Sequence, residues 1–471
     1  ETSLFLAILL IISLFFGSWA GFFLMVSALG NMISMHSALE KGQSVKSLVV
    51  KQVVGGFILL AFAYLAEGII GYKGAIGEWA IGNENWQDLI YYRGYHMETI
   101  HAVAWCVILN GVFQGLLSIN GNWKNIRRNI RIYAIAGIII VIVTQFVWWG
   151  FDGLVPDGNF SHGTDPVTGY EWKAGHLLLY DFWTNLGRVF WQPWAGAVEP
   201  VFPFLAVSFL GSIIALVIID AQKQGEKASP RPLTVGVIIG GTMAIAGLLG
   251  FVIGALTMGG DPFDTILTSL STAYDMTGIE NRFGWLWLPY FLMVTGAQLA
   301  TIFFIFRLVE FRGKAEPFAK KTLFFRRFGF VAFSVYTFQF IDVIVVRLLT
   351  LIPGFPEYRY GLFNEVQIWP AVVLIFVLWY AVLKAWEKVD YALGMEWCIA
   401  KLSEVLLPMK KKAVEGGAKL KWWQTPRLDP QASLHDAQWL EIIPRNALNT
   451  QAMVESKLVY KVSLIGFFFF P

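Results

Sequence analysis

Apolar blocks without polar interruption recur along the chain, each close to the roughly 20 residues that a helix needs to cross a bilayer. The blocks show no alternation of apolar and polar positions, so strands of a membrane barrel are not expected. The pattern predicts nine membrane-spanning helices, over residues 17–37, 51–71, 98–118, 132–151, 198–219, 234–258, 286–309, 329–352 and 369–388. Residues 3–16 are apolar but shorter, and we expect them to form a partial or interfacial helix.

These elements predict an all-α fold: a polytopic membrane bundle of about nine to ten transmembrane helices over residues 1–405, followed by a cytoplasmic tail over residues 406–471. The composition agrees with this class, because 56% of the residues are hydrophobic and only 15% are charged, whereas a soluble domain carries roughly 25% charge. Because the sequence begins with Glu1 rather than Met, we expect a further segment before it.

Lysine and arginine concentrate in alternate connections between the predicted spans. One set of connections carries 17 of them, over residues 38–51, 119–131, 220–233 and 307–327. The other set carries 6, over residues 72–97, 152–199, 259–285 and 353–368. The positive-inside rule then predicts a cytoplasmic (inner) membrane protein whose first set of connections and C-terminus are cytoplasmic. No basic tract or recognition motif indicates nucleic acid as a partner.

Glu98 and His101 are the candidate catalytic residues, at the predicted outer end of the third span. Their spacing of three places both on one helix face. A carboxylate beside an imidazole fixes the tautomer of the ring and raises its basicity, as a general base requires. The alternative is that His101 only caps a polar patch at the membrane interface.

Further polar residues lie inside apolar spans, where an ionisable side chain costs on the order of 3 kcal/mol unless it faces protein or water. Tyr336, Gln339 and Asp342 are spaced by three in the eighth predicted span, so we expect them to share a face and line a passage for a substrate. Glu67 lies near the outer end of the second span, close to the depth of His101, and is a candidate to bind substrate in the site of His101. The alternative for each residue is a clamp between helices.

Metal and haem sites are not expected. Haem ligation by two histidines needs both rings at one depth, whereas His36 lies at the predicted cytoplasmic end and His96 and His101 at the outer end. Cys106 and Cys398 lie in different regions, so they predict neither a disulfide framework nor a thiolate cluster.

A resemblance to a known family begins at Arg326 with "RRFGFVAFSVYTFQF" and continues to Leu402. This region resembles the C-terminal part of the YeiB-like membrane proteins. The matching positions are Gly329, Ala332, Tyr336 and Gln339, then Tyr360, Gly361, Leu362 and Phe363, and finally Gly394, Glu396 and Trp397. Met395 stands in place of a Pro-Leu pair, one residue fewer than in the family.

The front half is similar to the same family and to the heparan-alpha-glucosaminide N-acetyltransferase group, through "GFFLMVSALGNMISMHSALEKG" and "METIHAVAWCVILNG". The initial helix of the family, with its Arg-Gly and Asp signature, is absent from the sequence. The resemblance implies a transmembrane acyltransferase that takes acyl-CoA from the cytoplasm as cosubstrate and delivers the acyl group to an acceptor on the outer side.

The resemblance also implies roles for individual residues. His101, assisted by Glu98, would be the base, and Tyr336 and Gln339 would line the acyl path. Phosphates of CoA would bind to basic groups at the inner side, namely Arg127, Arg128, Arg131, Arg326 and Arg327. We expect membrane lipids as partners, and a homodimer or a larger complex formed through the C-terminal tail.

Two other functions remain open. One is a non-catalytic structural subunit of a larger membrane complex that keeps the acyltransferase-like fold. The other is a transporter, ranked lower because no pair of Gly/Pro-interrupted segments recurs in two halves of the chain.

Overall fold

The computed structural model describes residues 20–71, 74–80, 99–152, 163–164, 171–172, 193–194, 200–257, 287–311, 314–355, 365–407, 421–425 and 428–436. Almost all of these residues are helical, and the chain divides into two compact units. Unit 1 comprises Glu1–Leu60, Met97–Glu316 and Trp439–Phe468, and unit 2 comprises Ala61–His96, Pro317–Gln438 and Phe469–Pro471.

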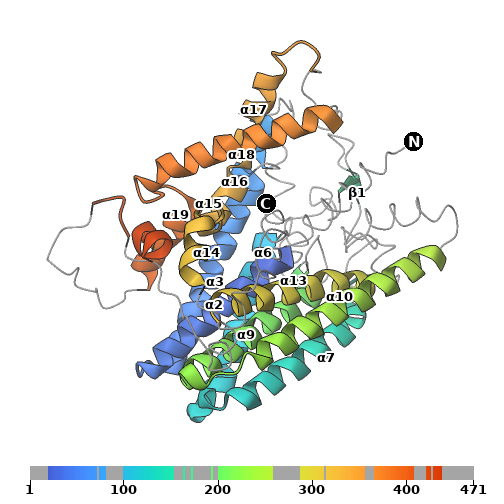
Figure 1. Cartoon of the computed structure of the whole chain (residues 1–471), viewed down its shortest axis with the longest axis vertical. Coiled ribbons are helices and arrows are strands. Elements are labelled where there is room, and N and C mark those ends of the chain that lie inside the picture. The colour runs from blue at the N-terminus through green and yellow to red at the C-terminus, as the bar shows by residue number, and fades with distance from the viewer. Residues whose placement is uncertain are drawn as a thin grey trace, which may run out of the picture. The chain divides into compact units, whose positions relative to one another are not determined.

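Unit 1 contains the long helices of the first two thirds of the chain (Figure 1). They are α2 (Ala20–Glu40), the first part of α3 (Val45–Leu65), α6 (Thr99–Ser118), α7 (Ile126–Asp152), α9 (Val201–Gln224), α10 (Arg231–Thr257) and α13 (Trp287–Val309). Shorter elements are the 3-10 turns η2 (Ile119–Lys124) and η5 (Gly225–Lys227), the start of α14 (Ala315–Lys321), and two paired strands, β1 (Gly163–Thr164) and β2 (Glu171–Trp172).

Helix α9 lies at the centre of unit 1, where it packs against α2, α6 and α7. It is apolar on all sides, as expected for a helix surrounded by others, and Ile214, Ala215 and Leu216 are fully buried. Helices α7 and α10 instead present large apolar side chains outward, with Ile138 61% and Ile238 60% exposed. Such surfaces are stable in lipid and not in water, which supports a membrane location for the bundle.

Helices α10 and α13 form a close pair through glycines. A Cβ atom on Gly240 would lie 2.5 Å from the backbone N of Ala300, and one on Gly296 would lie 2.5 Å from the backbone N of Ala244. Small residues allow the backbones of membrane helices to approach, which increases dispersion contacts where no hydrophobic effect drives association. The two glycines therefore set the separation of the pair.

Unit 2 is built from shorter elements around one long helix, α18 (Glu365–Glu387). The others are the π-turn η1 (Ala66–Ile70), α4 (Ala75–Ala80), α15 (Leu323–Phe330), α16 (Ala332–Thr337), the 3-10 turn η6 (Gln339–Ile341), α17 (Asp342–Leu349), α19 (Met395–Leu406) and the π-turn η7 (Gln431–His435). Its small core includes Val331, Trp379, Leu383, Tyr391 and Leu434.

Among the described residues, eight helices are long and apolar enough to cross a membrane. The helical, multi-pass membrane class is thus confirmed, whereas the number of nine to ten spans is not. The predicted span 329–352 is wrong as a single helix, because the backbone leaves helical geometry at Val331 (φ −125°, ψ 40°) and again at Phe338 (φ −92°, ψ 15°). The boundary between residues 405 and 406 and the sidedness of the tail stay predictions.

Candidate functional site

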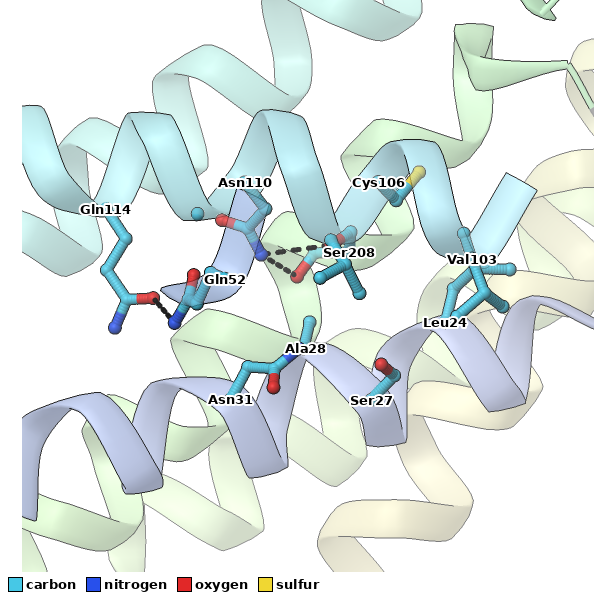
Figure 2. Close-up of a pocket in the computed structure, with 12 residues that line it drawn as sticks. Leu24, Ser27, Ala28, Asn31, Gln52, Val103, Cys106, Asn110, Gln114 and Ser208 are labelled. Carbon is cyan, nitrogen blue, oxygen red and sulfur yellow. Dashed lines mark hydrogen bonds between the residues drawn. The ribbon is translucent and has the colours of Figure 1, made fainter. Parts of the chain in front are cut away.

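A polar cavity lies inside unit 1 between α2, α3, α6 and α9 (Figure 2). Three of these helices contribute polar side chains four residues apart, so that each pair lies on one helix face. The pairs are Ser27 and Asn31 on α2, Asn110 and Gln114 on α6, and Ser208 and Ser212 on α9, of which all but Ser212 line the cavity. Gln52 of α3 and Cys106 of α6 complete its polar and sulfur-bearing lining.

Asn110 is the centre of the hydrogen-bond network at this cavity. Its Nδ2 donates to Ser208 Oγ and to Ser212 Oγ, both at 2.9 Å, and its Oδ1 accepts from the hydroxyl of Tyr133 at 3.2 Å. All four side chains are buried. Because each polar atom that loses its partner in an apolar interior costs about 1–3 kcal/mol, this network fixes α6, α7 and α9 against one another.

A second group of polar contacts joins α3, α6 and α2. Gln52 Nε2 donates to Gln114 Oε1 at 3.3 Å, and Gln114 Nε2 contacts Met32 Sδ at 2.8 Å. Figure 2 shows the side chains of Ser27 and Asn31 rising from α2 toward α6. They bring a hydroxyl and an amide into the cavity without a hydrogen bond to any described part of the chain.

The lining determines what the cavity accepts. The cavity is small, with a volume of about 10 Å³, which is room for about one water molecule. Apart from the thiol of Cys106, the lining groups are amides, hydroxyls and apolar side chains, and none is charged at neutral pH. A charged ligand would be desolvated here without compensation, so the cavity suits a small neutral group that both donates and accepts hydrogen bonds, such as a water molecule.

His101 lies on the same helix as Asn110 but on its other side. Nine residues separate them, which at 3.6 residues per turn corresponds to a rotation of about 180°. His101 is buried, with 1% of its surface exposed, and it does not line the cavity. Glu98 lies outside the described residues, so the predicted pairing of the two stays a prediction.

The predicted phosphate-binding residues Arg127 and Arg128 lie at the start of α7 and are exposed. Trp123, in the preceding η2 turn, lies close to two lysines, with Lys124 Nζ at 5.5 Å and Lys223 Nζ at 5.6 Å from its ring centre. This end of unit 1 is therefore basic and aromatic, as the charge distribution in the sequence predicts.

In unit 2, Glu67 and Tyr336 form the shortest polar contact between predicted site residues. The Tyr336 hydroxyl donates to Glu67 Oε1 at 2.5 Å. Glu67 is 5% exposed and lies in the π-turn η1, where one extra residue is accommodated in the helical turn. Such π-turns occur frequently at functional sites. The contact joins two residues predicted to bind substrate, although the sequence suggested the site of His101 for Glu67.

Gln339 and Asp342 do not continue this contact along one helix face. Tyr336 lies in α16, Gln339 in η6 and Asp342 at the start of α17. Gln339 is exposed, and Asp342 Oδ1 accepts a hydrogen bond from Trp379 Nε1 at 2.7 Å. The expected face of three polar residues is therefore divided by the interruption at Phe338.

Arg326 and Arg327 contact the C-terminal region of unit 2. Arg327 Nε lies 2.6 Å from Glu387 Oε2, and Glu387 Oε1 lies 2.5 Å from His435 Nε2. Arg326 donates to the carbonyl of Ser433 at 2.8 Å. The guanidinium of Arg327 is thus satisfied by a carboxylate, which competes with the predicted phosphate contact.

The residues of the Gly-Met-Glu-Trp stretch hold the interrupted segment in place. Glu396 Oε1 accepts from the backbone N–H groups of Phe333 at 2.7 Å and Ser334 at 3.2 Å, and its Oε2 accepts from the Ser334 hydroxyl. Ser334 Oγ in turn accepts from the N–H of Met395 at 2.7 Å. Burial raises the pKa of Glu396, and the hydrogen bonds from Ser334 and Phe333 oppose that rise.

The cavity residues of unit 1 were not predicted from the sequence. They are neutral amides and hydroxyls, whereas the predicted site residues are mostly ionisable groups inside apolar spans. The available signal was the repeated spacing of four between polar residues in three spans. Among the described residues, no group of three or more His, Cys, Asp or Glu side chains is arranged to hold a metal ion.

Comparison of the chain with family models, with curated proteins and with solved structures gives no match.

Proposed function

We propose that the protein is a membrane-embedded acyltransferase, which moves an acyl group from acyl-CoA on the cytoplasmic side to an acceptor on the outer side. The observation that carries the proposal is the neutral polar lining of the small cavity in unit 1, whose helices would have to separate to admit a ligand larger than water. The pantetheine arm of CoA contains amides and a hydroxyl and bears no charge. Amide and hydroxyl side chains such as those of Asn31, Gln52 and Gln114 match that chemistry.

The position of the basic residues in unit 1 supports the same assignment. Gln114 lies near the end of α6, and Lys124 lies in the η2 turn that follows, after a bend in the backbone at Asn120 and Gly121 (φ 56° and 76°). An arm bound along the last turns of α6 would run toward the basic residues Lys124, Arg127 and Arg128. Arginine recognises phosphate through paired, charge-assisted hydrogen bonds.

The transfer itself needs a base. His101, assisted by Glu98, would take the proton from the hydroxyl or amine of the acceptor; because His101 lies on the side of α6 away from the cavity, the thioester would have to reach it near the start of that helix. The acceptor atom attacks the thioester carbonyl, the carbon–sulfur bond breaks, and the released thiolate takes up a proton to leave as free CoA. The resemblance to the YeiB-like proteins supports these roles for the two residues.

The test uses purified full-length protein in nanodiscs and radiolabelled acetyl-CoA. We expect saturable binding that Gln114→Leu and the double variant Arg127→Gln/Arg128→Gln each weaken. His101→Ala should retain binding and abolish loss of the acetyl group, whether to an added acceptor or to water. Gly241→Ala is the matched control, because its added methyl group meets no atom within 4 Å. Absence of saturable binding, or full turnover by His101→Ala, contradicts the proposal.

Transport is the second candidate, because the structure shows an interrupted segment where the sequence predicts a continuous span. Broken helices in membranes occur where backbone lines a cavity or is buried in protein, and transporters use them at substrate sites. The Tyr336–Glu67 contact places a carboxylate beside this segment. Proton-dependent uptake into proteoliposomes that is lost in Glu67→Gln, without acetyl-CoA binding, would favour transport. Stable co-purification of a stoichiometric partner, without either activity, would favour the structural subunit.

A further inference from the structure

An apolar stripe lies on the outward side of the short helix α19. Leu402, Val405 and Leu406, spaced as one helix face, are 37%, 76% and 52% exposed. On the opposite side, Ala400 and Ser403 are 8% and 5% exposed. An amphipathic helix of a soluble protein buries its large apolar side chains, so this orientation indicates an apolar surrounding for the outward side.

The chain places α19 directly beside the end of a candidate membrane span. Helix α18 ends at Glu387, and the connection to Met395 is folded tightly rather than extended. Trp386 Nε1 donates to the carbonyl of Ala392 at 2.8 Å, and the N–H of Tyr391 donates to the carbonyl of Trp386 at 3.1 Å. Because a spanning helix ends at a membrane surface, α19 begins at that surface.

A tryptophan-rich segment, Lys421–Thr425, packs against α19. Trp397 Nε1 donates to the carbonyl of Trp423 at 2.6 Å, and Lys401 Nζ donates to the carbonyl of Gln424 at 2.6 Å. Trp422 is 66% exposed. Tryptophan is enriched at the boundary between acyl chains and headgroups, where one part of the indole is apolar and its N–H is polar.

Lysines accompany these aromatic groups. Lys421 Nζ lies 4.9 Å from the ring centre of Trp423, and Lys401 Nζ lies 5.7 Å from that of Trp397. Lysine stems extend along apolar surface while the ammonium group stays in water or at headgroups. Exposed apolar side chains, tryptophan and lysine thus occur together, the combination typical of helices that lie in the membrane interface.

We propose that α19 and Lys421–Thr425 form an interfacial anchor. The outward stripe of α19 and the Trp422 side chain enter the lipid at the surface where α18 ends, the exposed Lys421 faces anionic headgroups, and Lys401 holds Lys421–Thr425 against α19 through the carbonyl of Gln424. Lipid rather than a second copy is the occupant, because a stable protein interface buries about 800 Å² on each partner and α19 has only 12 residues.

Site-directed spin labelling of the full-length protein in nanodiscs of phosphatidylcholine and phosphatidylglycerol tests the anchor. Single labels are placed by Leu402→Cys, Val405→Cys and Leu406→Cys in a background lacking Cys106 and Cys398, which are the two cysteines of the chain. Ala432→Cys is the matched control, an exposed position of the same unit in η7. Collisions of each label with oxygen, which partitions into lipid, and with a water-soluble nickel chelate are compared.

We expect the ratio of oxygen to nickel collisions to be several-fold higher at the three α19 positions than at residue 432. Replacing Trp422 and Trp423 by Ser should lower the ratio at residue 405 toward that of the control. Equal ratios at all four positions would overturn the proposal. Dipolar coupling between labels on two copies of the protein, measured with lipid in excess, would also overturn the proposal, because it would show a second copy on this face.

Discussion

Two neighbouring glycines of α10 provide a direct test of the packing in unit 1. In Gly240→Ala, the new methyl carbon would lie 2.5 Å from Ala300 N and 2.7 Å from Gly296 O, both backbone atoms of α13. Ordinary contact begins near 3.4 Å, so the two helices must separate by about 1 Å. In Gly241→Ala, the methyl group meets no atom within 4 Å.

The two substitutions differ in the expected sign of their effect on stability. Overpacking costs about 1–3 kcal/mol, and replacement of a helical Gly by Ala stabilises by about 1 kcal/mol. Gly240→Ala should therefore lower the free energy of unfolding by up to about 2 kcal/mol, and Gly241→Ala should leave it unchanged or raise it by up to about 1 kcal/mol. The two variants should thus differ by the overpacking cost of about 1–3 kcal/mol, which for a large domain corresponds to a gap of about 2–12 °C in Tm.

The thiol of Cys106 supplies the assay, because it is 2% exposed and lies in the same unit. In a Cys398→Ser background, a thiol-reactive fluorophore reports the temperature at which unit 1 opens in detergent. The change in helix propensity is the same for both variants, so any difference between their melting temperatures measures the contact with α13. Identical melting of the two variants would refute the close approach of α10 and α13.

Three further substitutions test the polar contacts. Glu396→Ala removes the acceptor for two backbone N–H groups, which costs about 1–3 kcal/mol for each buried donor. Thiol labelling of Cys398 on α19 should therefore become faster, and an unchanged labelling rate would contradict the contact of Glu396 with Phe333 and Ser334. Asn110→Leu removes three hydrogen bonds that average about 0.6 kcal/mol each in a membrane protein, so Tm should fall in the Cys106 assay, whereas Asn31→Leu should not lower it. Tyr336→Phe removes the donor to Glu67, and unit 2 should lose about 1 kcal/mol of stability by the same labelling of Cys398; equal labelling of variant and parent would show that the contact contributes nothing.

The long helices were predictable because periodicity and length are local properties of the sequence. Helices α9 and α18 each fill one apolar block, and their residues needed no information from elsewhere in the chain to be identified as spans. The contact of Glu67 with Tyr336 was not predicted, because it joins residues 269 positions apart. Contacts of that separation depend on tertiary packing, which hydropathy does not contain.

The interruption of the segment 329–352 was not predictable from its own residues. It contains no proline, and its apolar character is typical of a span. The break at Val331 coincides with the capture of the Phe333 and Ser334 N–H groups by Glu396, a residue of another helix. A carboxylate that satisfies free N–H groups allows a new helix to begin there. The neutral cavity of unit 1 was not predicted for a related reason. An amide in one span indicates a polar site only when a second helix places another polar side chain beside it, and the sequence does not show which helices are neighbours.

The dependence of α16 on Glu396 also bears on the order in which the protein matures. The acceptor lies 63 residues after Phe333, and chains emerge from the ribosome with the N-terminal part first. Until α19 has been synthesised, nothing holds the break open, and an uninterrupted helix through Val331 satisfies its backbone better in lipid. We therefore expect the nascent chain to insert this segment as one continuous helix and to remodel it late, when the region around Glu396 arrives.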